Sequence, residues 1–69
     1  MKRKPDNYYF KVIAKRGTLV YTRYISSKTD NEPVVISQAV EKFPELIGMI
    51  LDRLERINLN EYLDGKNRN

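Results

Sequence analysis

The sequence contains no cysteine and no histidine among its 69 residues. These absences exclude a disulfide framework and a zinc site of the usual Cys/His kind. A chain this short buries only about 60% of the surface that its unfolded form exposes. We therefore expect one small domain over residues 1–69, stabilised by apolar packing or by a partner chain.

The same absences argue against catalysis, because histidine is the most frequent general base near neutral pH and cysteine is a frequent covalent nucleophile. Gly17, Gly48 and Gly65 stand alone, so there is no glycine-rich phosphate loop. The acidic residues are scattered, although a site built only from carboxylates stays open. We expect a protein that is not an enzyme and that holds no metal or cofactor.

Long apolar runs are also missing. No run approaches the roughly 18 residues of a membrane span, and residues 1–6 lead into no apolar signal segment. We expect a cytoplasmic protein without membrane association.

Charge is unevenly distributed along the chain. Residues 1–28 hold eight basic side chains against one acidic side chain, a net charge of +7, and residues 29–69 hold five against eight, a net charge of −3. Such asymmetry is a hint of binding to nucleic acid or to an acidic surface, although small basic proteins without such a partner are common.

Two segments of the basic half predict a β-hairpin. Residues 8–14 and 18–25 are rich in aromatic and β-branched side chains, and Lys15-Arg16-Gly17 lies between them. A two-residue turn at Arg16-Gly17 would make Tyr9 and Tyr24 cross-strand neighbours.

Period-two alternation sorts the hairpin into two faces, which a slip of one residue would exchange. The predicted core face carries Tyr8, Phe10, Val12, Ala14, Leu19, Tyr21 and Ile25, with Arg23 as its only charge. The predicted solvent face carries Tyr9, Lys11, Ile13, Lys15, Thr18, Val20, Thr22 and Tyr24.

The polar residues 26–33, closed by Pro33, indicate a loop. Residues 34–36 are ambiguous, because three β-branched side chains favour a short third strand whereas the apolar spacing up to Phe43 favours a helix. We expect a helix from about Ser37, preceded by a short extended segment.

The stretch after Phe43 predicts an amphipathic helix. Pro44 suits a first helical turn, and Glu45 complements the positive helix start. Apolar residues recur at steps of three and four, at Leu46, Ile47, Ile50, Leu51, Leu54 and Ile57. Met49 falls outside this stripe and is expected to be exposed.

A short last helical turn is expected near the C-terminus. Asn58 and Glu61 resemble a capping box, and Gly65 is expected to end the turn. Residues 66–69 are expected to fray. The predicted fold class is therefore α+β, with an N-terminal antiparallel hairpin, with or without a short third strand, packed against one or two C-terminal amphipathic helices.

The first functional hypothesis is a nucleic-acid-binding regulator. Basic side chains of the hairpin and of an N-terminal arm, residues 1–6, would contact phosphates, and two tyrosines would stack. The residues are Lys2, Arg3, Lys4, Tyr9, Lys11, Lys15, Arg16 and Tyr24. Lys, Thr and Tyr are also common on exposed sheet faces that bind nothing.

The alternative is a protein-binding regulator or inhibitor of the phage or mobile-element type, which docks on an acidic host protein or homodimerises through its apolar helix. Its interface would comprise Ile47, Met49, Ile50, Leu54, Ile57 and Tyr62. The simpler interpretation is that the apolar stripe only covers the hairpin, but a two-stranded hairpin is a small partner for so wide a stripe.

Overall fold

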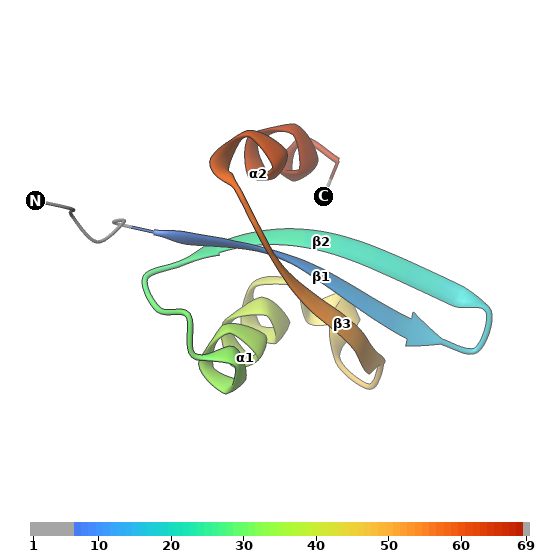
Figure 1. Cartoon of the computed structure of the whole chain (residues 1–69). Helices are drawn as coiled ribbons and strands as arrows, with labels where there is room; N and C mark the ends of the chain where they lie inside the picture. The colour runs from blue at the N-terminus through green and yellow to red at the C-terminus, as the bar shows by residue number, and fades with distance from the viewer. Residues whose placement is uncertain (1–6, 69) are drawn as a thin grey trace, which may run out of the picture.

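The computed structural model describes residues 7–68 of the chain. Its elements, in chain order, are strands β1 (Tyr8–Arg16) and β2 (Leu19–Ser27), helix α1 (Glu32–Lys42), the short 3-10 helix η1 (Pro44–Leu46), strand β3 (Ile50–Ile57) and helix α2 (Leu59–Lys66). The strands form one antiparallel sheet in the order β2-β1-β3, with α1 and α2 on opposite sides of it (Figure 1). The predicted α+β class and the N-terminal hairpin are confirmed, but the third strand is Ile50–Ile57 and not residues 34–36.

The hairpin turn lies one residue later than predicted. Arg16 pairs with Leu19, so Gly17 and Thr18 form the two-residue turn. Gly17 has a φ of 60° and is one of two residues with positive φ among those described, the other being Gly48. Glycine with positive φ at the first central position is typical of a type II′ turn. Arg16 therefore stays in the strand and avoids the strain of the predicted turn.

This shift changes every cross-strand pair of the hairpin. Tyr9 pairs with Ser26 and Lys11 pairs with Tyr24, so the predicted Tyr9–Tyr24 pair is wrong. Each β1 residue has a partner two positions later than predicted, and a shift of two leaves every side chain on its predicted face.

The predicted core face is the one that α1 covers, and we call it the α1 face. Its residues Phe10, Val12, Ala14 and Ile25 are buried, whereas Leu19, predicted for the core, is exposed near the turn. From α1 and the segment after it, Val35, Ala39, Phe43 and Leu46 complete the core.

Helix α1 begins at Glu32, several residues before the predicted start. The side chain of Asn31 accepts a hydrogen bond from the backbone N–H of Val34 at 3.4 Å, and Pro33 lies in the first turn. Residues 34–36, predicted as extended, are therefore helical. The cap and the burial of Val35 and Ala39, one turn apart on the sheet, outweigh the strand preference of the β-branched side chains.

The prediction of one helix after Phe43 is wrong. Only Pro44–Leu46 forms a 3-10 turn, and Gly48, with a φ of 83°, redirects the chain into β3. That φ lies in the left-handed region that glycine adopts without steric cost. Strand β3 then pairs with β1 and becomes one edge of the sheet.

A β-bulge explains why β3 resembles a helix in sequence. Ile13 faces Arg53, but the next β1 residue faces Leu51, so Asp52 is an extra residue on β3. The bulge places Leu51 and Leu54, three residues apart, on the same α1 face. A step of three between apolar residues is the spacing of an amphipathic helix.

Helix α2 begins as predicted, because the side chain of Asn58 accepts a hydrogen bond from the N–H of Glu61 at 2.8 Å. It continues to Lys66, so Gly65 does not end it and Lys66 is not part of a frayed tail. Helix α2 packs on β2 and β1, over the sheet face opposite the core, which we call the α2 face. Neither helix of residues 7–68 has the length and apolar character needed to cross a membrane.

Candidate interaction surface

Helix α2 covers one end of the α2 face, which we call the covered end, and its contacts there involve tyrosines. The ring of Tyr9 lies 4.9 Å from that of Tyr62, centroid to centroid. Gly65 lies so close to Tyr24 that the Cβ atom of any other residue at this position would overlap the ring. The structure thus brings together two tyrosines predicted to stack on nucleic acid and one predicted for a protein interface. All three are half-buried within the chain.

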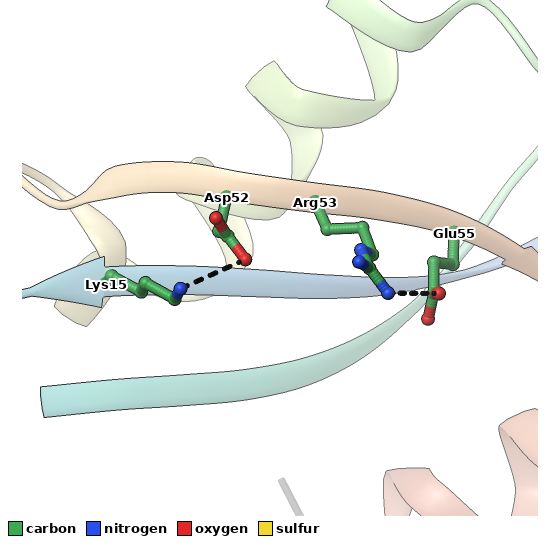
Figure 2. Close-up of polar contacts among 4 residues, drawn as sticks. All are labelled: Lys15, Asp52, Arg53 and Glu55. Atoms are coloured by element: carbon green, nitrogen blue, oxygen red, sulfur yellow. Dashed lines mark hydrogen bonds and ion pairs between the residues drawn. The ribbon is translucent and has the colours of Figure 1, made fainter.

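Beyond α2, acidic side chains of β3 lie beside the predicted basic row of β1. The Nζ atom of Lys15 is 3.4 Å from the Oδ2 atom of Asp52, and Arg53 donates to Glu55 at 3.2 Å (Figure 2). Lys11 is the register partner of Glu55. The charge of Lys15 is therefore compensated within the sheet, and Lys11 lies beside a carboxylate that is paired with Arg53.

The remaining predicted phosphate ligands lie elsewhere. Arg16 is exposed next to the hairpin turn and has no ion-pair partner among residues 7–68. Lys2, Arg3 and Lys4 lie outside the described residues.

The other end of the sheet, at the hairpin turn, carries exposed apolar side chains, which we call the apolar end. It comprises Leu19, Val20, Ile47, Ile50 and Leu51. Exposed fractions are 53% for Leu19, 56% for Val20, 65% for Ile47 and 75% for Ile50, against 37% for Leu51. Val20 and Ile50 are both register partners of Lys15, so they flank it on the α2 face. The hairpin projects past the start of β3 in Figure 1, which leaves this end uncovered.

The predicted protein-interface residues do not form one helical stripe. Ile47 and Ile50 belong to the apolar end, but Leu54 and Ile57 are half-buried on opposite faces of β3. Met49 is half-buried against the core, so the expectation that it is exposed is wrong.

Sequence reasoning did not foresee the exposure of Leu19 and Leu51, and it placed Val20 on the solvent face without assigning it to an interface. An available signal was Gly48, because an isolated glycine inside a helical pattern lowers the support for a continuous helix.

A small apolar hollow adjoins the apolar end. It has a volume of about 90 Å³ and lies between α1 and the sheet. Val12 and Ala39 form part of its wall, and Met49 and Leu51 border it where the chain enters β3. The apolar end is thus continuous with the core.

An ion pair fixes the segment that precedes Ile47. The Nε atom of Arg23, on the α1 face of β2, donates to the Oε2 atom of Glu45 in η1 at 2.9 Å. This hydrogen bond lowers the pKa of the Glu45 carboxyl below its ordinary value. The guanidinium of Arg23 also lies 5.0 Å from the centre of the Tyr21 ring.

Residues 7–68 hold no cluster of three or more carboxylates that could bind a metal ion. Comparison of the chain with protein-family models, with curated proteins and with solved structures found no match. The functional interpretation therefore rests on the geometry of this surface.

Proposed function

We propose that this chain is a protein-binding module whose apolar end contacts an apolar surface on another protein. The observation that carries the proposal is the gathering of Leu19, Val20, Ile47 and Ile50, each more than half exposed, at one end of the sheet. Leu19 lies on the α1 face, and Val20 and Ile50 lie on the α2 face. Exposed apolar side chains that gather in one region of a small protein commonly mark interaction sites.

The charge distribution supports an acidic rim on the partner. Residues 1–28 carry a net charge of +7, and Arg16 lies beside the apolar end with no ion-pair partner among residues 7–68. Opposite charge around an apolar contact raises the association rate and orients the two surfaces.

Nucleic-acid binding is the second candidate, and the same charge of residues 1–28 favours it. Its support is smaller, because Lys15 is paired with Asp52, Lys11 faces Glu55, and Tyr9 is in contact with Tyr62. Each internal pairing reduces the charge or ring surface that a phosphate or base could contact.

Photo-crosslinking in the cells that produce the protein tests the proposal. A photoreactive amino acid is placed at Val20 or Ile50, with Leu63 of α2 as the matched control, because Leu63 is also apolar and 42% exposed. We expect one protein adduct from the first two positions, resistant to nuclease, and none from Leu63. Adducts from all three positions, or none from Val20 and Ile50, would contradict the proposal.

A substitution and a titration complete the test. Ile50→Asp should lower capture of the crosslinked protein about tenfold or more, as expected for a central apolar contact. Circular dichroism should match the unsubstituted protein, because the side chain is exposed. If mixed-sequence DNA or RNA binds instead, with an affinity that falls steeply between low and high salt, the nucleic-acid function replaces the proposed one.

A further inference from the structure

We infer that two copies of this chain associate by antiparallel pairing of their β3 strands, centred on Leu54. Strand β3 is an edge of the sheet, so one row of its backbone hydrogen-bonding groups has no strand of residues 7–68 beside it. The main packing of α2 is on β2 and β1, and that of α1 is on η1 and β2. Figure 1 shows β3 at the side of the sheet away from β2. This inference goes beyond the proposed function, because it concerns other residues and a second copy as the partner.

The sequence of β3 is complementary to itself in one antiparallel register. Residues 51–57 run apolar, acidic, basic, apolar, acidic, basic, apolar. When a second copy is reversed about Leu54, Arg53 faces Glu55 on the α2 face and Leu54 faces its own copy on the α1 face. Asp52 and Leu51 align in sequence with Arg56 and Ile57, but the bulge places the members of these two outer pairs on opposite faces of the sheet. Opposite-charge and apolar cross-strand pairs both stabilise a sheet.

Neighbouring registers lack this complementarity. A shift by one residue places Asp52 opposite Glu55, or Arg53 opposite Arg56, depending on its direction. A shift by two places Arg53 opposite its own copy, or Glu55 opposite its own copy. Like charges directly opposite one another destabilise a strand pair, so the pattern selects the register centred on Leu54.

The central positions have the geometry that this pairing needs. Arg53 and Glu55 lie on the α2 face and are close enough to pair within one strand, as Figure 2 shows, with 62% and 38% of their side chains exposed. In the dimer each would face its opposite charge on the second copy. Leu54 points to the α1 face, is half-buried and would meet its own copy there. The outer pairs contribute less, because Asp52 lies at the bulge and is already bound to Lys15.

Charge reversal provides the test. In this register position 53 of one copy faces position 55 of the other. Arg53→Glu therefore places carboxylates opposite carboxylates at both pairs, and Glu55→Arg places guanidiniums opposite guanidiniums. Each variant alone should be monomeric. An equimolar mixture should form a heterodimer, because every new carboxylate then faces a guanidinium. The unsubstituted protein should sediment as a dimer of two 8.2 kDa chains, and each single reversal should raise the dimer Kd at least about tenfold.

Sedimentation velocity and native mass spectrometry measure these states. Lys28→Glu and Glu41→Arg are matched controls, because they reverse exposed charges outside β3 and should leave the dimer intact. The double reversal Arg53→Glu with Glu55→Arg should also dimerise, since it restores complementarity within each pair of copies. Its circular dichroism shows whether the strand tolerates both side chains.

The inference is overturned if the unsubstituted protein is monomeric at every concentration. It is also overturned if both single reversals remain dimeric, or if their mixture stays monomeric while the variants are folded. Ile50→Asp should leave the dimer intact, and Arg53→Glu should leave crosslinking from Val20 intact. Failure of the dimer is therefore distinguishable from failure of the proposed protein binding.

Discussion

The two ends of the α2 face both carry large aromatic or aliphatic side chains, but only one end is covered by α2. At the covered end, Tyr9 packs on Tyr62 and Tyr24 packs on Gly65. At the apolar end, Val20 and Ile50 project into solvent on either side of Lys15. An eight-residue helix is about 12 Å long, whereas a nine-residue strand extends about 30 Å, so α2 can close less than half of this face. The open end follows from the short length of α2.

The largest expected difference is between a core residue and a residue of the apolar end, measured as the change in the free energy of unfolding. Phe10→Ala removes a ring that is only 4% exposed, and we expect it to destabilise the fold by about 3–5 kcal/mol. Ile50→Ala, at the apolar end, should change the free energy of unfolding by no more than about 0.5 kcal/mol. Urea unfolding followed by circular dichroism compares the two. Equal losses would mean that Ile50 is not the exposed residue described here.

A smaller loss of stability is expected when the packing of α2 on the sheet is disturbed. Gly65→Ala places a methyl group against the Tyr24 ring, and we expect a net destabilisation of about 1–3 kcal/mol from overpacking. At an unconstrained helical site the same substitution is stabilising by up to about 1 kcal/mol. Adding Tyr24→Ala to Gly65→Ala should remove the clash, so the Gly65→Ala step should lose its cost in that background. Urea unfolding gives the sign, and a stabilised Gly65→Ala protein would refute the close contact.

The smallest expected effect concerns the ion pair that holds η1. The pKa of Glu45 lies below its ordinary value of 4.5, so its stabilising contribution is present above that value and is lost as the pH falls through the lowered pKa. Glu45→Gln should therefore have a lower Tm than the unsubstituted protein at about pH 6, and the difference should shrink by about pH 3. A difference that does not change with pH would show that the carboxylate charge is not responsible.

Much of the hairpin could be predicted from sequence, because its faces depend on period-two alternation and survive a register shift of two. The turn was displaced by one residue, since the pattern alone did not distinguish Arg16-Gly17 from Gly17-Thr18. The start of α2 was predicted correctly because the Asn58 cap is a local interaction.

The sequence failed as a guide at β3 for a non-local reason. Its Leu, Arg and Glu residues are good helix formers, and the bulge at Asp52 gives its apolar residues a helical spacing. Pairing with β1, a partner about forty positions earlier in the chain, outweighs both. The candidate surface therefore also differs from the prediction. The residues expected to form one apolar stripe on a helix are divided between the apolar end and the edge strand β3.

The central position of β1 in the sheet has a consequence for the order in which the fold assembles. Its pairing with β2 closes a short loop at once, whereas its pairing with β3 must wait for residues 50–57. During synthesis β1 is therefore made early, but the edge of β1 that pairs with β3 stays unpaired until most of the chain has left the ribosome. Long-range pairing of this kind slows folding, so the edge at which a second copy would bind forms only after residues 50–57 have paired with β1.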